Sequence, residues 1–187
     1  MEKPAAVFAV LSMSAADALV LLAGGGGAAD ACSDWDVPSM SAAAACQNAS
    51  TARAMSQICA DEVGTVTAPD QEANVFVLAA VNAAARSYEA TVGYLWPLVT
   101  DPSAPGAARA RGGAGLRAQQ QMGAAAGHLY GCELAELVRD VPAAVVAVDD
   151  CATALLQVFG VNSAWYRTVI GDRDRSMLAL RLTGLAI

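Results

Sequence analysis

Apolar residues recur at steps of three and four along much of the chain, which is the spacing of one buried helical face. The clearest run predicts a helix from about Asp70 to Val99. The stretch Thr100-Asp101-Pro102 ends it, because the residue before a proline avoids helical geometry. The apolar positions of this helix are Val77, Val81, Ala84, Tyr88, Val92, Leu95 and Val99. About 30 residues give a helix of roughly 45 Å, a length typical of helical bundles.

The same spacing predicts two neighbouring helices in the C-terminal half. A stretch from 101 to 115, rich in proline and glycine, predicts a long flexible connection, after which a helix starts near Leu116 and continues to Arg139. The next helix is predicted to begin at Asp140-Val141-Pro142, where an N-cap acid precedes a first-turn proline, and to run to Phe159-Gly160. These two helices would form an antiparallel hairpin whose turn lies at Asp140 to Pro142.

Helices are also expected at the two ends of the mature chain. Residues 42 to 63 predict a small closed hairpin that contains Cys46 and Cys59. Within it, Asn48-Ala49-Ser50 is an N-glycosylation sequon, which predicts an exposed turn if the chain is secreted. A last helix is expected to open at Gly171-Asp172. Its buried stripe would be Leu178, Leu182 and Leu185.

The N-terminal segment, residues 1 to 31, has the form of a secretory signal. An apolar, alanine-rich run follows Lys3, and Ala29-Asp30-Ala31 has the small-x-small form of a cleavage site. Asp17 and a run of four glycines interrupt the segment, so neither half is long enough to span a bilayer. The alternative is an ordinary N-terminal helix of a cytosolic protein. The first interpretation leaves residues 32 to 187 as one domain.

Composition supports an all-α protein with a protein partner. Of the 187 residues, 56% are hydrophobic, with alanine the commonest type, and only 5% are aromatic, which favours packed helices over a β-sandwich. The net charge of -7 argues against binding to nucleic acid, which needs clustered cations. An acidic surface instead favours a basic protein partner.

Five cysteines predict two disulfides and one spare thiol in an oxidising compartment. The separation of Cys46 and Cys59 suits a bridge across the small hairpin. Cys132 lies nine residues before Val141 and Cys151 ten after it, so both sulfurs would sit at a similar height on the predicted helix pair, where a disulfide is possible. Cys32 would then be the spare thiol.

Catalytic chemistry has no recognisable motif in this chain. His128 is the one histidine, and neither a Gly-x-Ser-x-Gly turn nor a phosphate-binding glycine loop occurs. No cysteine pair has zinc-knuckle spacing, and His128 is interpreted as a surface or core-edge residue. The adjacent Asp149 and Asp150 point about 100° apart on a helix, which does not suit a shared acid–base site. We therefore expect no catalytic residue, cofactor or metal ion.

Several stretches together resemble the plant invertase inhibitor and pectin methylesterase inhibitor family over about residues 32 to 187. They are Ala-Cys46-Gln-Asn-Ala-Ser with Ile58-Cys59, Val75 to Leu98 followed by Thr100-Asp101-Pro102, Val148-Asp149-Asp150-Cys151, Phe159-Gly160-Val161, Ser163, and Asp172 through Leu178 to Leu185-Ala186-Ile187. The resemblance implies a secreted, disulfide-bonded helical hairpin followed by an up-down-up-down four-helix bundle with a second disulfide.

The chain departs from that family's pattern in two places. The family's third cysteine stands in a Leu-x-x-Cys context, which Leu129 to Cys132 matches at an unusually short distance from Cys151; alternatively Gln119 replaces it. Invertase-directed members carry a Pro-Lys-Phe turn between the second and third bundle helices, where this chain has Pro142-Ala143-Ala144. Without that cation and ring, pectin methylesterase is the favoured target.

The resemblance thus implies a secreted, apoplastic inhibitor that blocks the substrate cleft of a cell-wall carbohydrate-active enzyme. Asp140 and Pro142, in the predicted turn, would face the enzyme. The alternative, from another class, is a non-inhibitory structural or interaction bundle. We expect no nucleic-acid partner and no membrane association in the mature form.

Overall fold

The computed structural model describes residues 36–187 except 65, 67, 68, 104 and 105, so the expected signal segment, residues 1–31, and Cys32 lie outside the described residues. The predicted all-α class is confirmed, because the described chain is predominantly helical. The helices are α1 (Ala42–Ala49), α2 (Arg53–Val63), α3 (Ala73–Thr100), α4 (Gly106–Tyr130), α5 (Leu134–Phe159) and α6 (Ala164–Ala186).

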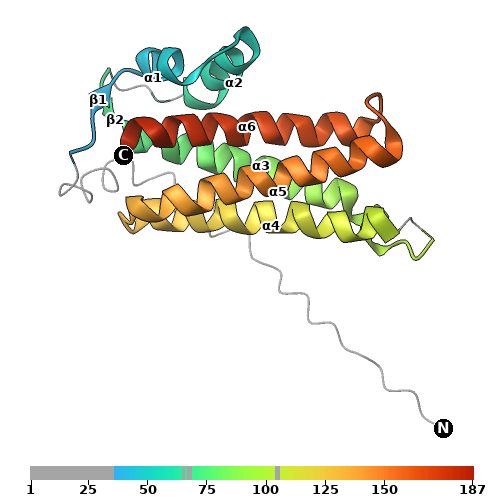
Figure 1. The fold of residues 1–187 in the computed structure, drawn as a ribbon. Helices are drawn as coiled ribbons and strands as arrows, with labels where there is room; N and C mark the ends of the chain where they lie inside the picture. Colours follow the sequence, from blue (N-terminus) through green and yellow to red (C-terminus); the bar gives the residue numbers. More distant parts are fainter. Residues whose placement is uncertain (1–35, 65, 67–68, 104–105) are drawn as a thin grey trace, which may run out of the picture.

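The four long helices, α3 to α6, lie side by side along their lengths (Figure 1). Helix α4 contacts α3 and α5, and α6 contacts the same two helices from the other side. Alanine and valine fill much of the interior, where small side chains let helix axes approach closely. The larger buried side chains include Phe76 and Tyr88 of α3, Met122 of α4, Leu137 of α5 and Leu178 of α6.

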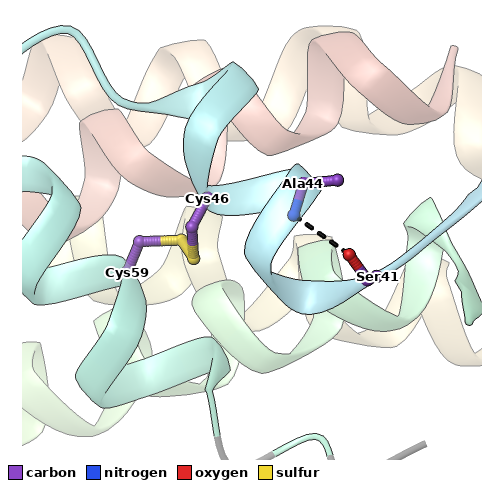
Figure 2. The surroundings of a disulfide bond; sticks show 4 residues. All are labelled: Ser41, Ala44, Cys46 and Cys59. Atoms are coloured by element: carbon purple, nitrogen blue, oxygen red, sulfur yellow. Dashed lines mark hydrogen bonds between the residues drawn. A yellow bond between two sulfur atoms is a disulfide. The ribbon is translucent and has the colours of Figure 1, made fainter. Parts of the chain in front are cut away.

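Helices α1 and α2 form the predicted small hairpin, which lies against α3 and α6 (Figure 1). Ser41 caps α1 by accepting a hydrogen bond from the backbone N–H of Ala44 at 3.2 Å. The predicted disulfide between Cys46 and Cys59 joins the two helices, with Cα atoms 5.5 Å apart (Figure 2). Cys59 and Val63 are fully buried in the same core as the long helices, so the bridge fixes the hairpin onto the rest of the fold.

A short antiparallel ladder, not expected from the sequence, connects the hairpin region to α3. Strand β1 (Ser39–Met40) pairs with β2 (Gln71–Glu72), and the N–H of Ala73 donates to the carbonyl of Pro38 at 2.9 Å. These bonds satisfy backbone groups at the start of α3. The helix begins at Ala73 rather than at Asp70 for this reason.

The predicted turn at Asp140 to Pro142 is wrong, because both residues lie inside α5. The chain reverses eleven residues earlier than Pro142, at Gly131 to Glu133, where Cys132 has a φ of 59°. Pro142 is accommodated because an interior proline removes one backbone hydrogen bond but need not end a helix that is otherwise packed. Asp140 therefore does not mark the start of a helix.

Two further boundaries differ from the sequence prediction. Helix α4 starts at Gly106, so most of the stretch predicted as a flexible connection is helical in spite of its glycines. Helix α6 starts at Ala164 rather than Gly171, with Ser163 as its N-cap accepting from the N–H of Tyr166 at 3.5 Å. In both places tertiary packing outweighs the local weakness of glycine.

Helix α5 is long and apolar enough to cross a membrane when judged by length and composition alone. The core helix of a globular protein meets the same criterion. Leu137, Val141, Ala144 and Val148 of α5 are buried against its neighbours, which accounts for the apolar sequence.

Candidate functional site

An apolar stripe runs along the outside of α5 and marks a candidate docking surface. Val138, Pro142 and Val146 are spaced four residues apart and therefore share one face of the helix. The exposed fraction is 59% for Val138 and 61% for Val146, and Pro142 is half-buried. Large exposed apolar side chains in a row are unusual on a surface that contacts only water.

A shallow groove of about 400 Å³ continues this stripe between α4 and α5. Its lining combines the apolar residues Pro142, Ala143, Val146 and Ala147 with the polar residues Arg117, Gln121 and Asp150. A mixture of apolar and polar residues is usual in a protein–protein interface. We define the α4–α5 face by the groove residues together with Val138.

Asp140, predicted to face a partner, is instead only 2% exposed. Its Oδ2 lies 2.8 Å from Nδ1 of His128, and its Oδ1 accepts a hydrogen bond from Nε of Arg139 at 3.1 Å. Both contacts lie within the protein, and only Oδ1 accepts a hydrogen bond within the described chain. Asp140 therefore positions the α4–α5 turn and cannot itself touch a docked protein, whereas Pro142 can.

His128 links the end of α4 to α5 across the turn. Besides Nδ1 on Asp140, its Nε2 lies 3.5 Å from Oε2 of Glu133 in the turn. Nδ1 of His128 and Oδ2 of Asp140 lie close together, but neither makes a hydrogen bond within the described chain. The expectation that His128 is a core-edge residue is confirmed, since its side chain is 26% exposed. No cluster of three potential metal ligands occurs among the described residues.

The predicted disulfide between Cys132 and Cys151 is wrong. Cys132 is disulfide-bonded, but Cys151 is a buried thiol inside α5. Cys132 lies in the turn just before α5 begins at Leu134, whereas Cys151 lies about 26 Å along α5 from Leu134. No bridge can cover that distance, since disulfide Cα atoms lie within about 7 Å.

The alternative that Gln119 occupies the place of a lost cysteine does not fit either. With the turn centred on Cys132, the α4 residue level with Cys151 is close to Ala114. Gln119 instead lines a groove on the other side of α4, together with Asn82 and Glu89 of α3. The second bridge of the resembled family is therefore absent at Cys151.

Asn48, the predicted glycosylation site, lies near the C-terminal end of α1 and is exposed. The hydroxyl position of its sequon, Ser50, is the C-cap of α1. The position is thus accessible at the end of a helix. Glycosylation itself stays a prediction.

A buried polar network joins α3 to α6 around Asp172, which is 1% exposed. Ser87 donates a hydrogen bond to its Oδ1, and behind it Tyr88 hydrogen-bonds Ser176, whose Oγ donates to the carbonyl of Asp172 at 2.7 Å. Burial raises the pKa of the Asp172 carboxyl, although the hydroxyls of Ser87 and Thr91 act in the opposite direction. Burial likewise raises the pKa of the Tyr88 phenol.

Sequence reasoning missed Val138, Val146 and Asp172. The four-residue spacing of Val138, Pro142 and Val146 was readable, but a helix assumed to start at Asp140 excluded Val138 from it. Asp172 was placed at a helix start, where carboxylates are usually exposed, because the helix was taken to begin seven residues too late.

No protein-family model matches the chain, and neither a curated protein nor a solved structure matches it significantly. Membership of the inhibitor family is accordingly a proposal that rests on the residues and their arrangement.

Proposed function

We propose that the protein is a secreted inhibitor of a cell-wall carbohydrate-active enzyme, and that it docks through the α4–α5 face to block the substrate cleft. The observation that carries this proposal is the apolar stripe of Val138, Pro142 and Val146 beside a groove with apolar and polar lining residues. Pectin methylesterase is the favoured target. The protein would contribute no catalytic residue, cofactor or metal to the complex.

The arrangement of the helices supports the resemblance on which this function rests. A hairpin closed by the Cys46–Cys59 disulfide precedes four long helices, and each long helix contacts two others. We interpret α3 to α6 as the up-down-up-down four-helix bundle of that family. Disulfides persist mainly in oxidising compartments, which supports secretion to the apoplast.

The preference for pectin methylesterase over invertase rests on the turn between the second and third long helices. In this chain that turn is Gly131 to Glu133 and contains neither lysine nor phenylalanine, and Pro142-Ala143-Ala144 lies inside α5. An anchor made of a cation and a ring is therefore missing at both positions. The groove offers apolar contact and the pair Arg117 and Asp150 instead.

An inhibition panel tests the proposal. The purified protein is mixed with a pectin methylesterase and, separately, with an invertase, and initial rates are measured over a range of substrate concentrations. Blocking of the cleft predicts an increase in the apparent KM of the esterase at unchanged kcat, because the protein and the substrate exclude each other. Unchanged rates of both enzymes at micromolar protein would refute the proposal.

The alternative, a non-inhibitory interaction bundle, is favoured by one observation. The stripe consists of valines and a proline, whereas the side chains that dominate binding energy in interfaces are mostly Trp, Tyr and Arg. In that case the protein would bind a partner through the same face without lowering the rate of either enzyme. A complex seen by gel filtration with unchanged enzyme kinetics would identify this outcome.

A further inference from the structure

Cys132 occupies the left-handed position in the turn that ends α4. The N–H of Glu133 donates to the carbonyl of His128 at 2.8 Å. The N–H of Cys132 donates to the carbonyl of Leu129 at 3.3 Å. This pair of hydrogen bonds is the Schellman motif, whose left-handed residue is usually glycine because a Cβ is disfavoured there. Cys132 adopts that geometry with a φ of 59°, so the turn alone does not explain why the residue is a cysteine.

The sulfur of Cys132 explains it, because Cys132 is disulfide-bonded. The chain has five cysteines. Cys46 and Cys59 are bonded to each other. Cys151 lies about 26 Å along α5 from the first residue of that helix, too far for a bridge to the turn. Within one chain, the cysteine left to pair with Cys132 is Cys32, which lies outside the described residues.

The α4–α5 turn lies within reach of the chain that precedes Pro38. The carbonyl of Pro38 accepts a hydrogen bond from the N–H of Ala73, the first residue of α3, at 2.9 Å. Helix α4 runs back along α3, so the start of α3 and the α4–α5 turn lie at the same end of the four long helices (Figure 1). Axes of packed helices lie about 8–10 Å apart. Six extended residues, 32 to 37, can span about 20 Å, which is enough to reach the turn.

We propose that Cys132 forms a disulfide with Cys32, the second disulfide of this protein. Each thiol gives up its hydrogen as the S–S bond forms. The two electrons and two protons pass to another disulfide, such as oxidised glutathione, which becomes two thiols. The bridge ties the beginning of the 32–187 domain to the turn that leads into α5, and Cys32 is then not a spare thiol. The proposal does not rest on the inhibitory function, because it uses only the cysteines and the turn.

Peptide mapping without reduction tests the pairing on the full chain, folded in a mixture of reduced and oxidised glutathione. Thiols are alkylated in denaturant, and the protein is then cleaved by trypsin together with a protease that cuts before aspartate. Asp34 and Asp36 separate Cys32 from Cys46, so the two cysteines fall in different fragments. The peptide that contains Cys132 can therefore be assigned to one partner by mass spectrometry.

The expected product is the tryptic peptide 118–139, which contains Cys132, linked to the fragment that contains Cys32. Reduction should release the two fragments at equal amounts. Recovery of Cys132 in alkylated form would overturn the proposal. A link from Cys132 to any other cysteine, or to Cys132 of a second copy, would overturn it as well.

Cys32→Ser and Cys132→Ser remove the proposed bond from its two ends. Each variant should expose the other cysteine to alkylation and leave the Cys46–Cys59 link in place. The bond closes a loop of about 100 residues, so both variants should lower the Tm by a similar amount, roughly 10–15 °C. The matched control Cys151→Ala should retain the linked peptide. A Cys132 that resists alkylation in Cys32→Ser, with an unchanged Tm, would overturn the proposal.

Discussion

Removal of the Cys46–Cys59 disulfide should destabilise the whole protein and not the hairpin alone. The variant is Cys46→Ala combined with Cys59→Ala, and the two positions are 13 residues apart. Without the bridge, the unfolded chain regains the entropy that the closed loop had removed. This gain lowers the free energy of unfolding by about 3 kcal/mol for a loop of that length. Ala45, Ala49 and Val63 of the hairpin are buried in the core shared with α3 and α6, so loss of the hairpin exposes that core.

Urea denaturation and differential scanning calorimetry at neutral pH measure this effect. For a domain of this size, about 3 kcal/mol corresponds to a fall in Tm of roughly 6–12 °C in one cooperative transition. The matched control is Cys151→Ala, which also removes a buried sulfur but breaks no disulfide and should cost about 1 kcal/mol. A double variant within about 0.5 kcal/mol of the wild type, or a hairpin that melts in a separate transition, would refute the reasoning.

Three further outcomes follow from single residues. The raised pKa of Asp172 means that the folded protein holds this proton more tightly than the unfolded chain does, so the contribution of this group to stability falls as pH rises above about 4. Asp172→Asn should remove that decline when the free energy of unfolding is measured by urea denaturation from pH 4 to 8. An unchanged dependence of the free energy of unfolding on pH would contradict this prediction. His128→Ala leaves Oδ2 of Asp140 without its partner and should lower the free energy of unfolding by about 1–3 kcal/mol, whereas equal stability would show that the pair contributes nothing. Pro142→Ala restores a backbone donor inside α5 and should raise the free energy of unfolding by about 1–3 kcal/mol; a lower value would mean that the proline is better accommodated than helix propensity implies.

The sequence predicted the helical class, the long helix α3 and the disulfide-bonded hairpin because each depends on local signals. The three- and four-residue spacing of apolar side chains located α3 to within a few residues. The separation of Cys46 and Cys59 allowed only a short hairpin between them. These features need no knowledge of distant parts of the chain.

The turn between α4 and α5 was misplaced because two local signals pointed to the wrong position. Asp140 followed by Pro142 has the form of a helix start, yet the carboxylate is used by His128, a residue of the preceding helix. The true turn, at Gly131 to Glu133, has a glycine and a residue in left-handed geometry, Cys132. That one error also produced the wrong disulfide, since the height of Cys151 was counted from the wrong turn.

The α4–α5 face did not follow from the sequence, because it is defined by a pair of helices. The α4–α5 face needs the correct register of Val138 and Val146 against Arg117. The buried polar network between α3 and α6 likewise brings Ser87 and Asp172 together, although 85 residues separate them in the chain. Contacts of that range carry no periodic or spacing signal.

The claim that the α4–α5 face blocks pectin methylesterase is tested most directly by comparing inhibition by two variants, each of which replaces a valine of similar exposure. Val146→Asp places a charge in the α4–α5 face, where the native side chain is 61% exposed, and Val161→Asp places it at the turn between α5 and α6, where the side chain is 60% exposed. Titration of the esterase should show equimolar loss of activity with the wild type and with Val161→Asp, and at least tenfold weaker inhibition with Val146→Asp. No inhibition by the wild type at micromolar concentration, or equal inhibition by the two variants, would contradict the account.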